Sequence, residues 1–262
     1  MNKKNYLQSG LLIIFIAALL VVSSLTWNAM RGDFYYARAS ATSDRQQAFK
    51  LYQQAFEAFP QHHDYQAAYL NATLVQGFSD PQQSSAYEEI IQNAIIPKLP
   101  PQPSKPVRDS LSMYNRLKKG LQIQQPYLET FKNIHDAALV DVEPINFLPD
   151  QPTSPNGEKV LGRIDGQNLL TQLSFETKDA SPETLSKTIL LFYFDDEKLP
   201  EVALRLSDFT AGGTFPFVSR FVRQSGTVIV ESAPLYVESG VEIRCLGSCE
   251  SGVGGYVRKV GE

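Results

Sequence analysis

The most prominent feature of the hydrophobic pattern is an apolar run near the N-terminus. No charged residue occurs between positions 6 and 30, and residues 11–22 are almost entirely apolar. As a helix, residues 10–30 would rise about 30 Å, which matches the hydrocarbon core of a bilayer. We therefore predict a transmembrane helix at residues 10–30, with residues 1–9 forming a short N-terminal segment.

The charges that flank this run predict its orientation. Lys3 and Lys4 precede it, whereas Arg31 and Asp33 follow it and nearly cancel. By the positive-inside rule the N-terminus is cytoplasmic, and residues 31–262 lie outside the cytoplasm, in a periplasm or at a cell surface. Trp27 occupies a position typical of an interfacial aromatic residue.

A cleaved signal peptide is the main alternative to a retained anchor. The densest apolar part covers only residues 11–22, and the small residues Ser23 and Ser24 follow it, as in a signal peptide. A buried helix of a soluble protein is a further alternative. We favour the anchor, and both exported interpretations place residues 31–262 outside the cytoplasm.

Residues 31–142 have a helical pattern. It continues without a break from residue 10 to residue 41, so the anchor is expected to run directly into the first exported helix. Ser43 or Asp44 can cap the next helix, which ends at Phe59-Pro60. Further helices are expected at residues 80–96, at residues 111–121 after a proline-rich break, and from Pro126 onward.

One part of this region resembles a known repeat. Ala48, Tyr52, Ala55 and Pro60 have the offsets of the second helix of a tetratricopeptide repeat, with residues 34–41 as its first helix. The tryptophan and glycine positions of the repeat are not filled, so a generic helical hairpin remains an alternative. The same stretch also resembles the segment after the last membrane helix of some O-antigen ligase or polymerase-like proteins, which implies an auxiliary role in polysaccharide assembly.

The pattern becomes β-like after a proline-rich stretch. Residues 143–157 contain four prolines and an Asn-Gly turn, and we predict an interdomain linker there. Short alternating or apolar runs follow, with turn signals between them, and they predict an antiparallel β-sandwich at residues 158–262. The expected fold class is α+β and multidomain: a transmembrane helix, a helical region that resembles tetratricopeptide repeats, and a C-terminal sandwich.

The β region has a faint family resemblance of its own. Residues 191–199, Gly212-Gly213 and residues 225–231 resemble cohesin-like and carbohydrate-binding-module-like sandwiches, in which an Asp-rich turn precedes a Gly-Thr-Val strand. The resemblance implies binding of a protein or a glycan outside the cell and assigns no binding residue. An exposed row of aromatic rings would favour a glycan, and their burial would count against it; the available rings are Phe192, Phe194, Phe215, Phe217 and Tyr236.

Composition and cysteine usage narrow the classes of function. The 262 residues carry a formal net charge of −4, which argues against nucleic acid as a partner. Cys245 and Cys249 are the only cysteines. Their spacing does not fit a redox Cys-x-x-Cys motif, and a zinc site would need further ligands. We predict a disulfide between Cys245 and Cys249, with two free thiols as the alternative.

The remaining polar clusters do not predict catalysis. Asp195-Asp196-Glu197 offers carboxylates for Ca²⁺, but no Ca²⁺-loop pattern is present and a solvated turn is favoured. His62 and His63 point in different directions on a helix, which does not suit one metal ion. Asn71 begins a glycosylation sequon inside a predicted helix. We expect no catalytic residue, no metal and no cofactor.

The functional hypothesis combines these predictions. We expect a membrane-anchored, exported, non-enzymatic interaction or scaffold protein of a cell-envelope assembly, in contact with the bilayer and with a protein partner. The alternatives are a surface-anchored glycan-binding module and an auxiliary subunit of polysaccharide-assembly machinery.

Overall fold

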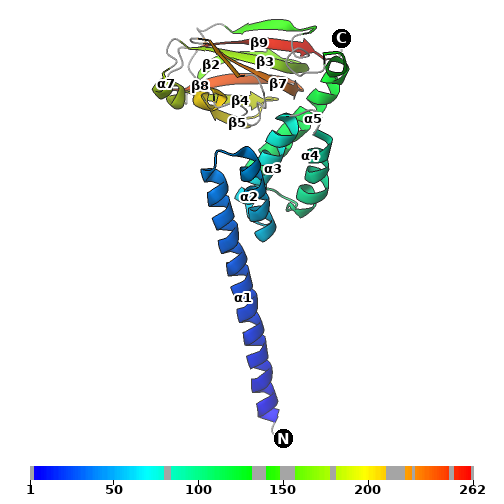
Figure 1. The fold of residues 1–262 in the computed structure, drawn as a ribbon, viewed down its shortest axis with the longest axis vertical. Helices are drawn as coiled ribbons and strands as arrows, with labels where there is room; N and C mark the ends of the chain where they lie inside the picture. Colours follow the sequence, from blue (N-terminus) through cyan, green and yellow to red (C-terminus); the bar gives the residue numbers. More distant parts are fainter. Residues whose placement is uncertain are drawn as a thin grey trace. The chain divides into compact units, whose positions relative to one another are not determined.

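The chain forms a mixed structure of helices and antiparallel sheets in two compact units (Figure 1). The anchor unit contains Met1–Thr73 and Ile90–Val107, and the sheet unit contains Leu74–Glu89 and Arg108–Glu262. The computed structural model describes residues 3–79, 84–131, 140–147, 157–177, 181–210, 222–225, 228–247 and 251–260.

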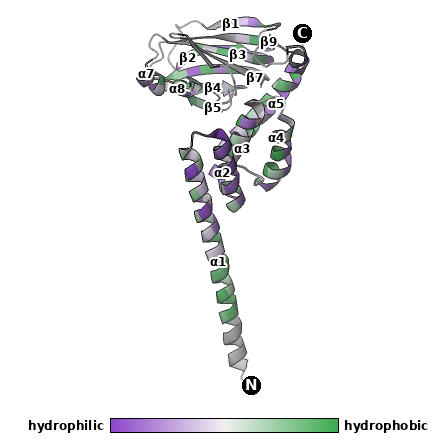
Figure 2. Ribbon diagram, viewed as in Figure 1, coloured by the Kyte–Doolittle hydropathy of each residue, from purple (hydrophilic) through white to green (hydrophobic). Residues whose placement is uncertain are grey.

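Helix α1 of the anchor unit is a single element of 39 residues, Lys3–Ala41. It passes from the apolar run into the polar residues beyond position 30 without a break, as the pattern predicts. Figure 2 shows this change in hydropathy along α1, from a green band to purple turns toward its C-terminal end. An unbroken α-helix is rigid over this length, so the apolar run is not joined to the rest of the unit by a flexible tether.

Helix α2, Arg45–Ala58, begins and ends where the sequence predicts. The Asp44 side chain accepts hydrogen bonds from the backbone N–H groups of Gln46 and Gln47, at 2.9 and 3.1 Å. Such a cap satisfies two of the donors that a helix leaves free at its N-terminus. At the other end the helix stops at Phe59, because the following proline disfavours helical backbone in the residue before it.

Aromatic side chains hold α3, His63–Ser79, against the first two helices. The Tyr69 ring lies 5.3 Å from that of Phe56, both buried. The Tyr65 hydroxyl donates a hydrogen bond of 2.5 Å to Asp33 Oδ1. The Tyr65 ring also lies against Gly32, where an added Cβ would be only 2.6 Å from it. The contact of α3 with α1 therefore requires a residue without a side chain at position 32.

The helices that follow differ in detail from the predicted ones. Helix α4, Ser84–Ile90, continues into the π-helix η1, Ile91–Ile95, and the 3₁₀ turn η2, Ile96–Lys98. The expectation that a new helix begins at Pro126 is wrong, because α5 spans Lys105–Phe131 with Pro126 inside it. The buried side of α5 continues through Gln124, and the exposed proline costs the helix one backbone hydrogen bond without ending it.

The described residues of the sheet unit form two antiparallel sheets. The five-stranded sheet has the order β1-β9-β3-β7-β6, and the four-stranded sheet has the order β2-β8-β4-β5. Two short helices, α7 (Pro182–Lys187) and α8 (Leu206–Thr210), lie before β4 and after β5 in the chain. The strands are β1 Glu143–Phe147, β2 Lys159–Asp165, β3 Asn168–Thr177, β4 Ile189–Phe194, β5 Val202–Arg205, β6 Val222–Ser225, β7 Val228–Val237, β8 Gly240–Leu246 and β9 Ser251–Lys259.

Both sheets carry fully buried side chains. Leu173 and Phe175 of β3 are 0% exposed, as are Phe192 of β4 and Ile243 of β8. Strand β4 was predicted from its solid apolar run, Ile-Leu-Leu-Phe-Tyr-Phe, which is typical of a strand that is buried on both sides. Its position between β8 and β5 agrees with that pattern.

The stretch expected to be a linker begins with a strand. Residues 143–147 form β1, which pairs with β9 in antiparallel register from Glu143↔Val257 to Phe147↔Val253. Pro144 can occupy this strand because β1 lies at the edge of its sheet, where a missing N–H need not interrupt a ladder. Residues 148–156 of the expected linker lie outside the described residues.

Helix α5 approaches the five-stranded sheet very closely. A Cβ added to Gly120 would lie 1.8 Å from the carbonyl oxygen of Pro234 in β7. Further along, the Arg258 guanidinium lies 3.7 Å from the centre of the Tyr127 ring, and its Nη2 donates a hydrogen bond of 2.5 Å to the carbonyl of Val140. Side chains of α5 are thereby placed at the ends of several strands, where the polar site described below is located.

Candidate functional site

The first candidate functional feature is the apolar part of α1. The segment Leu12–Ala41 has a mean hydropathy of 2.1 in its most apolar stretch, none of which is buried. It is long and apolar enough to cross a membrane, a property that a signal sequence shares. Of the predicted flanking residues, Lys3 and Lys4 lie in the first turn of α1, Trp27 is 61% exposed, and the Arg31 guanidinium lies 5.9 Å from the Tyr35 ring centre.

The second candidate is a polar site centred on the turn that follows β4. Asp195 and Asp196 have φ angles of 53° and 62°, and the carbonyl of Phe194 accepts a hydrogen bond of 3.0 Å from the N–H of Glu197. Two successive positive φ angles are those of a type I′ turn, and aspartate is among the residues that tolerate them best. This backbone directs the two neighbouring carboxylates toward different partners.

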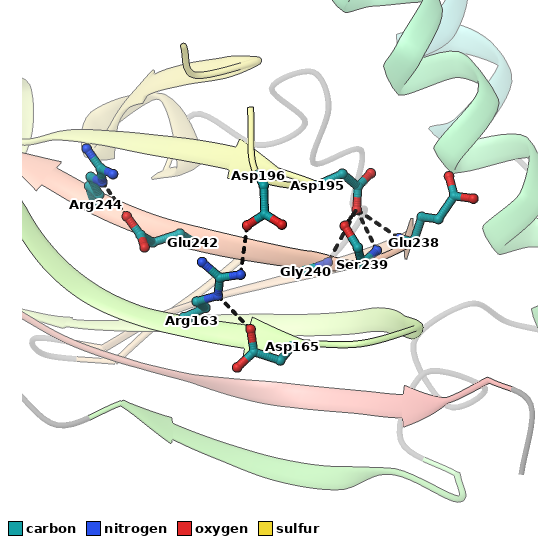
Figure 3. A network of polar contacts seen from close by, with 9 residues as sticks. All are labelled: Arg163, Asp165, Asp195, Asp196, Glu238, Ser239, Gly240, Glu242 and Arg244. Carbon is teal, nitrogen blue, oxygen red and sulfur yellow. Dashed lines mark hydrogen bonds and ion pairs between the residues drawn. The ribbon is translucent and has the colours of Figure 1, made fainter. Parts of the chain in front are cut away.

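Asp195 ties this turn to the turn between β7 and β8 (Figure 3). Its Oδ1 accepts hydrogen bonds from the N–H groups of Glu238, Ser239 and Gly240, at 3.1, 2.7 and 3.3 Å. Asp196 and Glu197 are exposed, as expected of a solvated turn, whereas the partly exposed Asp195 carboxylate is held by the neighbouring turn. A carboxylate whose oxygens already accept these bonds is a poor candidate for the predicted alternative, a Ca²⁺ ligand.

The other oxygen of Asp195 belongs to an ion cluster around the buried Arg116. Arg116 of α5 is 9% exposed, and its Nη2 lies 2.7 Å from Asp195 Oδ2 and 2.9 Å from Glu201 Oε1. Its Nη1 donates a hydrogen bond of 3.3 Å to the carbonyl of Tyr236. The guanidinium also lies 4.4 Å from the centre of the Phe194 ring. One arginine thus joins α5 to elements of both sheets.

These partners determine the ionisation of Asp195. Burial alone raises the pKa of the carboxyl group, but the N–H groups of Ser239 and Gly240 and the charge of Arg116 outweigh it, and the pKa is lowered below its ordinary value. Asp195 is therefore ionised throughout the neutral range, and its negative charge stabilises the folded state.

A small pocket lies on the four-stranded sheet beside this turn. Its volume is 140 Å³. Arg163 of β2 projects from the sheet, with its Nε 2.6 Å from Asp165 Oδ1 and its Nη2 2.7 Å from Asp196 Oδ1 (Figure 3). The lining residues come from β2, β4, β8 and the turn after β4: Arg163, Tyr193, Asp196, Glu197, Gly240, Val241, Glu242 and Arg244.

The other side of the pocket is more enclosed. Glu158 is 8% exposed and accepts hydrogen bonds from the Tyr193 hydroxyl at 3.0 Å and from Arg244 Nη1 at 2.7 Å. Burial and this hydrogen bond raise the pKa of Tyr193, so the hydroxyl remains a donor at neutral pH. The pocket thus presents guanidinium and carboxylate groups in fixed positions, which suits the recognition of polar or charged groups.

The chain has no detectable relative among known protein families or curated proteins. The resemblances to tetratricopeptide repeats and to cohesin-like or carbohydrate-binding sandwiches therefore stay predictions. The site has to be interpreted from its own geometry. Among the described residues, no group of three or more His, Cys, Asp or Glu side chains is placed to hold a metal ion.

The structure describes one of the two cysteines of the predicted disulfide. Cys245 lies in β8, is 0% exposed and is disulfide-bonded. Cys249 lies outside the described residues, so the pairing of Cys245 with Cys249 stays a prediction. A disulfide here would close a short loop directly after an inner strand of the four-stranded sheet.

Other residues considered from the sequence take part in ring stacking or in hydrogen bonds within the protein. The expectation that His62 and His63 point in different directions on a helix is wrong, because His62 precedes α3 and the two rings stack with centres 5.2 Å apart. His62 also stacks on Tyr65 at 4.1 Å. In the sequon that begins at Asn71, the Thr73 hydroxyl is buried and donates a hydrogen bond of 2.7 Å to the carbonyl of Tyr69. This threonine is therefore occupied inside α3.

The aromatic rings proposed for glycan binding are buried where they are described. Phe192 and Phe194 are 0% exposed and Tyr236 is 5% exposed. Phe215 and Phe217 lie outside the described residues. A sugar stacks on an exposed ring face, so the burial of these three rings counts against a glycan platform formed by them.

The arginines of the polar site were missed from the sequence. Arg116 and Glu201 are 85 positions apart, and neither lies in a recognisable motif. A weaker signal was available for the pocket, because Arg163-Ile-Asp165 and Glu242-Ile-Arg244 each place charges two positions apart on a strand. Such charges share one face of a sheet, and together the two strands indicate a polar surface.

Proposed function

We propose that this chain is a membrane-anchored, exported, non-enzymatic interaction protein of a cell-envelope assembly. The observation that carries the proposal is the exposed apolar run of α1, which continues without interruption into a folded helical unit. A signal peptide is removed and has no need of such continuity, whereas an anchor that is also the first helix of the folded protein benefits from it. The cytoplasmic N-terminus follows from Lys3 and Lys4.

The exported location of residues 31–262 has independent support. A structural disulfide persists in oxidising compartments outside the cytoplasm, and Cys245 is disulfide-bonded. In this proposal the two antiparallel sheets pack face to face as a sandwich, and the helices of residues 31–142 form the scaffold that resembles tetratricopeptide repeats. These finer assignments are part of the proposal.

The partner contact is proposed at the pocket around Arg163. The side chains of Arg163, Asp165 and Asp196 are 44%, 75% and 66% exposed, so their charges are accessible to a binding protein. Arginine and tyrosine are enriched among residues that dominate binding energy, and Tyr193 and Arg244 complete the pocket. Fixed charges of both signs favour a partner with the complementary arrangement.

Purification in a mild detergent tests this proposal. The tagged chain should be recovered from membranes together with a protein partner, identified by mass spectrometry. Arg163→Glu reverses the charge at the pocket and should abolish the recovery of the partner. Arg45→Glu makes the same charge change at an exposed position of α2 and should leave the recovery unchanged.

Two results would contradict the proposal. Recovery of the chain alone, under conditions that keep other envelope complexes intact, would remove the assembly role. Equal partner recovery with Arg163→Glu and with the wild-type chain would remove the pocket as the contact surface.

A further inference from the structure

The turn between α2 and α3 extends back toward the apolar run of α1. Helix α2 is antiparallel to α1 and packs along its second half (Figure 1). The Tyr52 ring of α2 lies 5.7 Å from the Tyr36 ring of α1, and its hydroxyl is 3.4 Å from Ser40 Oγ. Tyr52 is thus level with Tyr36 to Ser40.

The level of the turn on α1 follows from helix geometry. Each residue of an α-helix advances about 1.5 Å, so from Tyr52 to the end of α2 at Ala58 the chain moves back by about 9 Å. This brings Ala58 level with residues 30–34 of α1. The exposure of α1 agrees, because residues 12–27 are all exposed while Asn28 and Ala29 are half-buried.

The start of α3 gives the same level independently. Tyr65, in the first turn of α3, lies against Gly32 and donates its hydroxyl hydrogen bond to Asp33. The turn Phe59–His62 is therefore fixed close to residues 28–33 by contacts on both sides. These positions coincide with the end of the apolar run, where the hydrocarbon core of a bilayer ends if α1 spans it.

The residues of the turn suit the zone of the lipid headgroups. The segment from Phe59 to His62 carries no Asp, Glu, Lys or Arg, and it offers an aromatic ring, a proline, an amide and an imidazole. Gln61 is exposed, and the exposed Trp27 side chain directly precedes residues 28–33 of α1. Aromatic and uncharged polar groups are favoured at the boundary between the hydrocarbon core and water.

We propose that the turn Phe59–His62 contacts the lipid headgroups of the membrane that α1 crosses, so that the anchor unit rests on the membrane surface. The proposal depends on the anchor function proposed above. The charged end of α2, at Asp44 and Arg45, lies at the far end of the same hairpin and remains in water.

Tryptophan fluorescence in lipid vesicles provides the test, because Trp27 is the only tryptophan of the chain. In a Trp27→Phe background, Gln61→Trp reports on the turn, and Gln46→Trp reports on the far end of α2. Both glutamines are exposed, so neither change disturbs the core. The full-length variants are reconstituted in vesicles of zwitterionic lipid with bromine atoms near the headgroup end of the acyl chains.

The expected result is that Gln61→Trp loses most of its fluorescence to the brominated lipid and is shielded from iodide in the buffer. Gln46→Trp should behave in the opposite way. Equal and strong quenching of both variants by iodide, without quenching by lipid, would overturn the membrane contact. His63→Trp, at a second exposed position, should follow Gln61→Trp.

The native Trp27 separates this proposal from the anchor itself. Quenching of Trp27 by the brominated lipid, combined with an unquenched Gln61→Trp, would overturn only the contact of the turn. An unquenched Trp27 in the reconstituted chain would mean that α1 does not span the bilayer, and both proposals would then fail.

Discussion

Two arginines of the sheet unit bind the two aspartates of one turn, and their surroundings differ. Arg116 pairs with Asp195 with only 10% of its side chain exposed, while Arg163 pairs with Asp196 with 44% of its side chain exposed. The buried pair links α5 to both sheets, and the exposed pair borders the pocket. Of two aspartates that are adjacent in the sequence, Asp195 thus supports stability, while Asp196 is available for binding.

Removal of the buried arginine should have the largest effect on stability. Arg116→Ala leaves the carboxylates of Asp195 and Glu201, whose side chains are 22% and 10% exposed, without their cation. Breaking a fully buried ion pair costs about 3–5 kcal/mol, and we expect a loss toward the lower end of that range here. Chemical unfolding of the wild-type and variant chains in the same detergent measures the loss. A change no larger than that of Arg163→Ala would contradict the distinction between the two arginines.

The close approach of α5 to β7 should be the next most sensitive feature. Gly120→Ala would place its Cβ 1.8 Å from the carbonyl oxygen of Pro234, so helix or strand must move. Overpacking of this kind costs about 1–3 kcal/mol, and it would also displace Arg116, one turn earlier in α5. Thermal unfolding measures it, and Gly166→Ala, where an added Cβ meets nothing within 4 Å but φ is +85°, separates backbone strain from the clash.

Acid should weaken the buried pair selectively. The pKa of Asp195 is lower in the folded than in the unfolded chain, so its stabilising contribution is complete above the unfolded value of about 4 and is lost as the pH falls below it. Asp195→Asn should reduce the loss of stability between neutral and acidic pH. Unfolding curves at a series of pH values test this, and an unchanged pH dependence in the variant would contradict the role of Asp195.

Removal of the exposed arginine should have the smallest effect on stability. Arg163→Ala breaks ion pairs that are open to solvent and screened by salt, so the midpoint of thermal unfolding should not change measurably. Partner recovery, in contrast, should fall. A clear drop in the unfolding midpoint would show that the exposed cluster is structural and not a binding surface.

The features that the sequence predicted differ from those that it missed in how far apart the interacting residues lie. Helix α1 and strand β4 were predicted because each depends on an apolar run within one short segment. Strand β1 was missed because its proline and polar residues, followed by further prolines, resemble a linker, and it is a strand only through pairing with β9, more than a hundred residues later. Local pattern therefore predicts single elements, while pairings between distant segments are invisible to it.

The polar site was largely unpredictable for a related reason. Asp195 was recognised as part of an acidic turn, but its positive φ angle and its bonds to Glu238, Ser239 and Gly240 depend on tertiary structure. Its partner Arg116 lies in a helix that was interpreted only from its apolar positions. The sequence therefore indicated where charges are clustered, and the structure distinguishes Asp195, with 22% of its side chain exposed, from Asp196, with 66% exposed.

In the proposed function, α1 anchors the chain and the folded units lie outside the cytoplasm. Protease treatment of sealed, right-side-out membrane vesicles tests it most directly, with mass spectrometry of the fragments that remain in the membrane. Residues beyond the membrane should be digested from outside, while an N-terminal fragment that contains Lys3, Lys4 and the apolar run should stay protected. Full protection of the chain until the vesicles are opened, or a chain that lacks this N-terminal segment, would contradict it.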